Sequence, residues 1–88
     1  MGELEIIDQL TTEARKRGIA LKRGRGYSVA IAGTTVTATD NLASFPTSTG
    51  ATRHIAVLDR LGAAKVVDLV VADADPAAVF AHKRRART

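Results

Sequence analysis

Six basic side chains fall within eleven residues of the chain, and their types suit the binding of phosphate groups. Residues 15–25 contain no acidic residue and carry Arg15, Lys16, Arg17, Lys22, Arg23 and Arg25. Arginine binds a phosphate through two parallel hydrogen bonds, and a run of cations releases counterions from a nucleic-acid backbone. We therefore expect a nucleic-acid interface in this segment. The alternative is a solvated surface beside the end of a helix.

Three further residues are candidates for the same interface. The single tyrosine, Tyr27, follows the basic segment, where its ring could stack on a base or pack across neighbouring strands. Arg53 and Arg60 are seven positions apart and would share the solvent-facing side of a helix. That helix would extend the basic patch if it lies beside the segment. The run Gly24-Arg25-Gly26 could hold a phosphate with backbone amides, although a plain hairpin turn explains it equally well.

A second basic group lies near the end of the chain and consists of Lys83, Arg84, Arg85 and Arg87. It could be an arm for nucleic acid, an anchor to anionic lipid or a solubilising end. Binding to a membrane surface normally requires a larger apolar face than Phe80 alone supplies. We therefore expect no membrane partner, and a solubilising end is the more usual explanation of such a group than an arm for RNA or DNA.

The residues that could support catalysis are few. The chain has no cysteine, which excludes a disulfide framework, a zinc ribbon and a thiol nucleophile. Its two histidines have no carboxylates at metal-ligand spacing, so we expect no metal and no cofactor. His54 could act as a general base with Asp59 or Ser28, but a lone histidine beside a helix is usually a surface residue. We assign no catalytic residue and lean away from an enzyme.

Composition limits the classes of protein further. The chain has 88 residues, 45% of them hydrophobic, and a formal net charge of +4, values typical of one folded domain. No apolar run approaches the roughly 20 residues that span a bilayer. The first residues are acidic where a signal peptide is positively charged, so we expect a cytoplasmic protein. Three aromatic residues are too few for a typical reader of single-stranded RNA by base stacking.

The hydrophobic periodicity predicts the elements that must position these side chains. Residues 3–17 predict a helix, with Leu4, Ile7, Leu10 and Ala14 on one face and Gly18 as its stop. Alternating residues then predict a three-stranded antiparallel meander over 19–22, 27–32 and 35–39. Small polar residues and Pro46 predict a loop over 40–50. A second helix is predicted over about 50–61, with Ala51, Ile55, Leu58 and Leu61 on one face and Gly62 as its stop.

The remaining segment has two interpretations. Residues 65–72 are nearly all apolar and β-branched, which fits a short buried strand, yet their valines also recur at helical spacing. An unpaired strand here would favour a homodimer through residues 65–80. Asp75 and Pro76 predict the N-cap and first turn of a terminal helix that runs to about Arg85.

Together these elements predict one α+β domain, residues 1–88. Two helices would cover one face of the sheet and leave the other open. Residues 3–62 would form its core, and residues 63–88 a C-terminal extension with a basic tail.

Several short matches within about residues 4–62 follow the order helix, strand, turn, strand, turn, strand, loop, helix. They are Arg17-Gly18-Ile19-Ala20-Leu21-Lys22-Arg23, Gly26, Gly33-Thr34-Thr35-Val36-Thr37, Pro46, Ile55, Leu58 and Gly62. This arrangement resembles the HicA-type toxin domain of toxin–antitoxin systems, which has a double-stranded-RNA-binding-like fold. The resemblance implies RNA-binding geometry.

The chain departs from that family at its proposed catalytic position. The family's turn usually reads Gly-Ser-His, and the histidine is its proposed ribonuclease residue. Here the turn reads Gly26-Tyr27-Ser28, and a serine hydroxyl does not shuttle protons near neutral pH as imidazole does. The resemblance therefore implies binding more than cleavage.

Three functions follow from the sequence. The first is a small basic protein that binds an RNA or DNA backbone. The second is a ribonuclease toxin with a relocated catalytic group, which requires His54 or Ser28 beside the basic hairpin. The third is a protein-interaction or inhibitor module of the toxin–antitoxin or phage-accessory type, binding its partner through the open sheet face or residues 65–80.

Overall fold

The computed structural model describes residues 2–80, which begin with the amphipathic helix α1, Glu3–Lys16. Its buried side chains recur at steps of three and four residues and include Ile6, Ile7, Leu10 and Ala14. Leu4 was predicted on this face but is exposed. The helix stops where expected, since Gly18 has a φ of +67°, a conformation that glycine adopts without strain.

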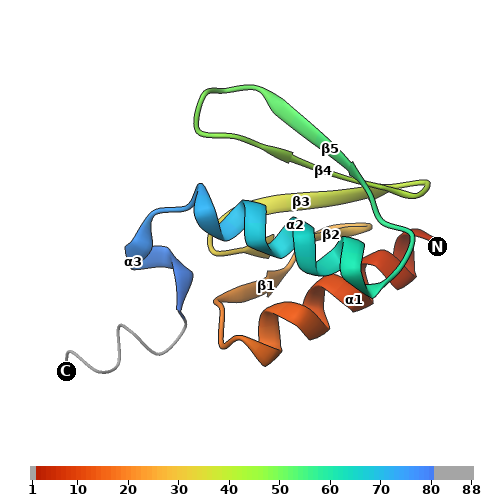
Figure 1. The fold of residues 1–88 in the computed structure, drawn as a ribbon, viewed down its shortest axis with the longest axis horizontal. Coiled ribbons are helices and arrows are strands. Elements are labelled where there is room, and N and C mark those ends of the chain that lie inside the picture. The colour runs from red at the N-terminus through yellow and green to blue at the C-terminus, as the bar shows by residue number, and fades with distance from the viewer. Residues whose placement is uncertain (1, 81–88) are drawn as a thin grey trace.

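A five-stranded antiparallel sheet follows α1, with the strands in chain order (Figure 1). The strands are β1 (Leu21–Arg23), β2 (Ser28–Ile31), β3 (Thr34–Thr39), β4 (Leu42–Pro46) and β5 (Thr52–Ala56). The first three correspond to the predicted meander. The other two lengthen the sheet beyond the order of three strands and a helix on which the HicA resemblance was based.

Two predicted elements are wrong at β4 and β5. Residues 40–50, predicted as a loop, contain β4, because Pro46 stands at the last position of that strand and interrupts little of its pairing. Residues 50–61, predicted as a helix, contain β5, in which Ile55 pairs with Ala43. Leu58, which the helical period placed on the buried face, is exposed.

The two faces of the sheet differ because side chains alternate along each strand. One face carries the buried residues Val29, Ile31, Val36, Ala38, Ala43 and Phe45 and is covered by the helices. The other face carries the exposed Thr35, Thr37 and Thr39 of β3. An α+β fold with helices on one face of an antiparallel sheet is therefore confirmed.

Helix α2, Arg60–Ala72, includes residues 65–72, which the sequence left open between strand and helix. Asp59 caps it by accepting a hydrogen bond from the Gly62 amide at 3.0 Å. Val66, Val67 and Val70 are buried against the sheet and α1. The argument for a homodimer through residues 65–80 depended on an unpaired strand, and a helix with buried valines removes that argument.

A short helix, α3 (Pro76–Val79), ends the described part of the chain. Asp75 is its N-cap and Pro76 its first residue, as predicted. The helix stops earlier than expected because Phe80 is extended and bridges to Ile19, while the Ala20 amide donates to the Val79 carbonyl at 2.7 Å. Residues 81–85 of the predicted helix, and Lys83, Arg84, Arg85 and Arg87, lie outside the described residues.

None of the helices within residues 2–80 has the length and apolar character needed to cross a membrane.

Candidate functional site

Five exposed cations lie in the last turn of α1, in β1, the outermost strand of the sheet, and in the turn after β1. We call this surface the basic edge, and it consists of Arg15, Lys16, Lys22, Arg23 and Arg25. β1 has a strand neighbour, β2, on one side only, and no acidic residue occurs in the chain between positions 14 and 39. Arg15 and Lys16 thus lie in the last turn of α1, Lys22 and Arg23 alternate between the two faces of β1, and Arg25 lies in the turn that follows.

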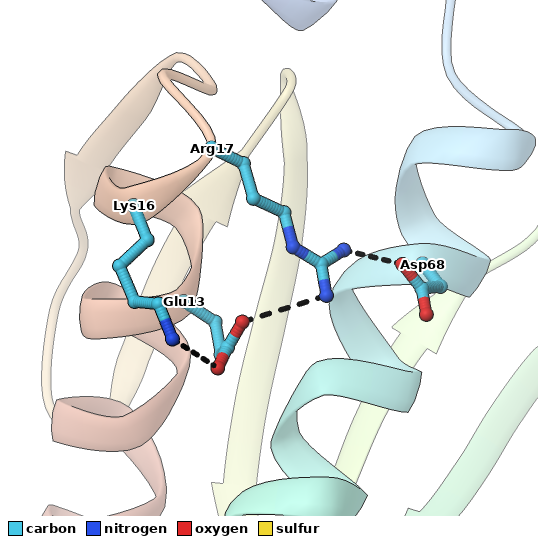
Figure 2. Close-up of polar contacts among 4 residues, drawn as sticks. All are labelled: Glu13, Lys16, Arg17 and Asp68. Carbon is cyan, nitrogen blue, oxygen red and sulfur yellow. Dashed lines mark hydrogen bonds and ion pairs between the residues drawn. The ribbon is translucent and has the colours of Figure 1, made fainter.

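Arg17, the sixth cation, reaches toward α2 and joins the two long helices (Figure 2). Its guanidinium contacts Glu13 of α1 at 3.4 Å and forms a short ion pair with Asp68 of α2. Lys16 approaches the same Glu13 carboxylate at 3.4 Å. We call Glu13, Arg17 and Asp68 the helix seam. Arg17 was predicted as a phosphate ligand, but its charge is already used by these two carboxylates.

The turn after β1 fixes the position of Arg25. The Ser28 hydroxyl donates to the Arg25 carbonyl at 2.6 Å, and the Gly24 amide donates to the Ser28 carbonyl at 3.1 Å. A Cβ at Gly24 would collide with the Ser28 hydroxyl, and Gly26 has a φ of +57°. The hairpin turn thus uses both glycines and the buried Ser28 side chain. Tyr27 is half exposed beside Arg25, so its ring is accessible to a ligand of the basic edge.

Arg53 and Arg60 do not extend the basic edge as predicted. Arg53 lies on β5, at the opposite edge of the sheet, and pairs with Phe45. Four interstrand steps of about 4.8 Å separate β1 from β5, or about 19 Å in total. Arg60 begins α2, so the two arginines belong to different elements and share no helix face.

Arg53 instead lines a cavity of about 580 Å³ between the β4–β5 hairpin and the end of α2. Phe45, Leu69 and Ala72 form its apolar wall, and Thr47, Ser48, Thr49, Thr52, Arg53, His54 and Asp73 supply polar groups. The lining of the cavity thus includes one cationic side chain and several hydroxyl groups. Sequence reasoning missed this site, because its two walls come from separate segments of the chain, residues 45–54 and 69–73.

Asp73 lines the cavity and binds Ser48, which lies in the connection between β4 and β5. Its carboxylate accepts hydrogen bonds from the Ser48 amide at 2.6 Å and from the Ser48 hydroxyl at 2.7 Å. The hydroxyl and amide bonds of Ser48, helped by the nearby positive charge of Arg53, lower the pKa of Asp73 below its ordinary value. Asp73 thus acts as a structural acceptor at the C-cap of α2.

His54 and Ser28, the candidates for a relocated catalytic group, do not meet. His54 Nδ1 lies 2.7 Å from the Ser44 hydroxyl on the open sheet face, and Asp59 is engaged in capping α2. Three interstrand steps, or about 14 Å, separate His54 on β5 from Ser28 on β2. The ribonuclease hypothesis required one of them beside the basic hairpin. Ser28 is adjacent but donates its hydroxyl within the turn, and His54 is remote.

Among residues 2–80, no group of histidine and carboxylate side chains is arranged to hold a metal ion. Comparison of the chain with protein-family models, with curated proteins and with solved structures finds no significant match. The basic edge and the cavity therefore have to be interpreted from their own chemistry.

Proposed function

We propose that the protein binds the phosphate backbone of a nucleic acid through the basic edge. The observation that supports this proposal most is that five exposed cations lie in the last turn of α1, on β1 and in the turn after it, with no acidic residue between positions 14 and 39. Such a surface attracts a polyanion at long range and releases condensed counterions on contact. Because Arg15, Arg23 and Arg25 are arginines, the edge also offers bidentate contacts to phosphate oxygens.

The length of the edge suits a duplex. The chain from Ile19 to Gly24 is extended and covers about 16 Å at about 3.3 Å per residue. One strand of a duplex carries a phosphate for about each 3.4 Å of its axis. An edge laid along a duplex therefore meets about five phosphates of one strand. The resemblance to HicA-type and double-stranded-RNA-binding domains favours duplex RNA among the candidate ligands.

The path of the chain supports the same surface. Phe80 bridges to Ile19, immediately before β1, so the chain leaves the described region beside the basic edge. The sequence then supplies Lys83, Arg84, Arg85 and Arg87 within seven residues of that point. The proposal includes these four cations as further contacts to the same backbone.

The proposed recognition is independent of base sequence. Phe45 is buried, and Tyr27 and Phe80 are the two exposed rings near the basic edge. Base stacking on protein surfaces normally uses several placed rings, so charge and shape carry most of the proposed affinity.

Fluorescence anisotropy with a labelled 16-base-pair RNA duplex, the matching DNA duplex and a single strand tests the proposal. Five phosphate contacts to the DNA duplex give a slope of log K against log salt near about −4.5 between 50 and 200 mM salt. The double variant Arg23→Ala, Arg25→Ala is expected to reduce the size of the slope by about 2 and to weaken binding to both duplexes.

The variant Arg53→Ala, Arg60→Ala is the matched control, because it removes the same charge away from the basic edge. It is expected to bind almost as the unchanged protein does. Absence of binding at 50 mM salt, a flat salt dependence, or equal losses in the two double variants would contradict the proposal.

A further inference from the structure

The cavity between the β4–β5 hairpin and the end of α2 has the size and lining of a small-molecule site. Its volume of about 580 Å³ lies within the usual range of ligand pockets, about 300–1,000 Å³. Phe45, Leu69 and Ala72 form its apolar wall, and Arg53 adds a positive charge. Ligand pockets typically combine such apolar walls with a few polar groups that fix the orientation of the ligand.

The strand register places the Arg53 side chain on the cavity side of the hairpin. Arg53 pairs with Phe45 across β4 and β5, and directly paired residues point to the same face of a sheet. Phe45 is buried on the face that the helices cover, so the Arg53 side chain lies on that face too. The next residue, His54, points to the opposite face, where it contacts Ser44.

The end of α2 supplies the other wall. Leu69 is three positions before Ala72 and four before Asp73, so the three residues lie on one side of the helix. The Ser48 amide and hydroxyl donate to the Asp73 carboxylate at 2.6 and 2.7 Å, which ties the β4–β5 connection to this side. Figure 1 shows the connection above the C-terminal end of α2. Contacts within the protein therefore hold both walls in place.

The hydrogen-bonding groups of the cavity are unequally occupied. Both Asp73 oxygens accept hydrogen bonds from Ser48, and the Thr47 hydroxyl donates to the Ala51 carbonyl at 3.1 Å. Arg53, in contrast, has no ion-pair partner within residues 2–80. Its guanidinium therefore has donors available for an anionic ligand.

The charge of Asp73 favours a ligand with a single negative charge. After the hydroxyl and amide bonds of Ser48, the positive charge of Arg53 also helps to lower the pKa of Asp73, so the guanidinium and the carboxylate lie near each other. A carboxylate ligand matches the guanidinium with two parallel hydrogen bonds. A phosphate dianion would add a second negative charge, which Asp73 repels.

We propose that the cavity binds a small molecule that carries one carboxylate beside an apolar ring. Arg53 binds the carboxylate, and the ring packs on Phe45, Leu69 and Ala72. This site goes beyond the nucleic-acid function proposed above, because it lies at the opposite edge of the sheet from β1 and shares no residue with the basic edge.

Titration of the full chain with 3-phenylpropionate, followed by amide NMR shifts, tests the proposal. The neutral 3-phenylpropanamide, acetate and phenyl phosphate separate the effects of charge, ring and type of anion. The carboxylate is expected to bind with a Kd of about 1 mM, typical of so small a ligand, and to shift the amides of Thr47, Ser48, Arg53 and Leu69. Each of the other three compounds is expected to bind at least about fivefold more weakly.

Arg53→Gln is expected to weaken binding of 3-phenylpropionate at least about fivefold, because it removes the charge and the paired donors. Arg60→Gln is the matched control, since Arg60 lies at the other end of α2, about 18 Å from Ala72 at about 1.5 Å per residue. Ala72→Leu fills part of the cavity and is also expected to weaken binding. Residue 72 is exposed and leucine suits a helix, so this variant keeps its fold, which urea denaturation checks.

Equal affinity for 3-phenylpropionate and its amide would overturn the proposal, as would tighter binding of phenyl phosphate or no shift with ligand up to about 10 mM. Unchanged affinity in Arg53→Gln would also overturn it. Duplex binding by the same variant separates the two proposals, since Arg53 lies outside the basic edge. Loss of 3-phenylpropionate binding with duplex binding intact would support a ligand site that is independent of the nucleic-acid surface.

Discussion

The helix seam and the basic edge contain the same kind of side chain, almost next to each other in the chain, in opposite situations. At the seam, Arg17 lies between the Glu13 and Asp68 carboxylates. At the basic edge, Arg15 and Arg23 are exposed on the same segment of sequence. The difference is one of orientation, since the Arg17 side chain points toward α2, whereas the Arg15 and Arg23 side chains are exposed to solvent.

The comparison shows that the number of cations in a segment overstates its capacity to bind phosphate. The Glu13 side chain is only 8% exposed, and a buried carboxylate without a paired cation is costly. The positive charge of Arg17 therefore offsets the cost of burying the Glu13 carboxylate between two helices. Lys16 also contacts Glu13, whereas Arg15, Lys22, Arg23 and Arg25 form no ion pair within residues 2–80, and their charge is available to a ligand.

Arg17→Ala is the strongest test of the seam. It is expected to lower the free energy of unfolding by about 1–3 kcal/mol, because Glu13 keeps only the 3.4 Å contact with Lys16. Urea denaturation measures the change. Arg15→Ala, an exposed cation two residues earlier, is the control and is expected to cost less than about 0.5 kcal/mol. Equal losses of unfolding free energy in the two variants would mean that the ion pairs of the helix seam do not stabilise the fold.

The reverse result is expected at the basic edge. Lys22→Glu with Arg25→Glu should change the free energy of unfolding by less than about 0.5 kcal/mol, since both side chains are exposed. The affinity for a nucleic-acid duplex at 50 mM salt should fall by more than about tenfold. Urea denaturation and anisotropy on the same samples separate the two effects, and a large loss of stability would contradict the distinction between the regions.

A smaller effect is expected at the outer end of the seam. Asp68 is 66% exposed, so Asp68→Ala should cost at most about 1 kcal/mol. Double-variant cycles should give a larger coupling energy for Glu13 with Arg17 than for Asp68 with Arg17. If the Asp68 coupling proves larger, the buried carboxylate is not the reason for the seam.

The smallest effect concerns Asp73, an exposed carboxylate that also serves structure. Hydrogen bonds from Ser48 lower its native pKa from the ordinary 3.8, so the unfolded state binds the proton more readily. The stabilisation is therefore complete above 3.8 and is lost as the pH falls through the lowered native pKa. The Ser48 amide shift should follow that titration, and Asp73→Asn should abolish it. A Ser48 shift that does not change in acid would show that the contact is absent in solution.

The first half of the fold could be predicted from the sequence because its signals are local. The period of α1, the stop at Gly18 and the turns at Gly26 and Gly33 each depend on a few adjacent residues. The same holds for the cap that Asp75 forms on α3. These elements predicted the positions of Arg15, Lys22, Arg23 and Arg25, but not the direction of Arg17 or the separation of Arg53 and Arg60 from the basic edge.

The second half could not be predicted in this way because β4 and β5 exist through pairing. Leu42–Pro46 has weak strand propensity, and it forms a strand because β3 and β5 supply its hydrogen bonds on both sides. The spacing of Ile55, Leu58 and Leu61 fits a helix face, yet only Ile55 packs against the core. Periodicity alone does not show which apolar residues are buried in the core and which are exposed.

The sequence by itself determined the charge pattern, the first helix, its stop and the presence of a basic hairpin. Each of these depends on residues that are adjacent in the chain. Only the tertiary structure decided that Arg17 binds Glu13 and Asp68 and that Arg53 lines a cavity. Each of these depends on segments that meet across the fold, 51 residues apart in the pair of Arg17 with Asp68. Such meetings are set by the packing of α1, α2 and the sheet, which no local pattern encodes.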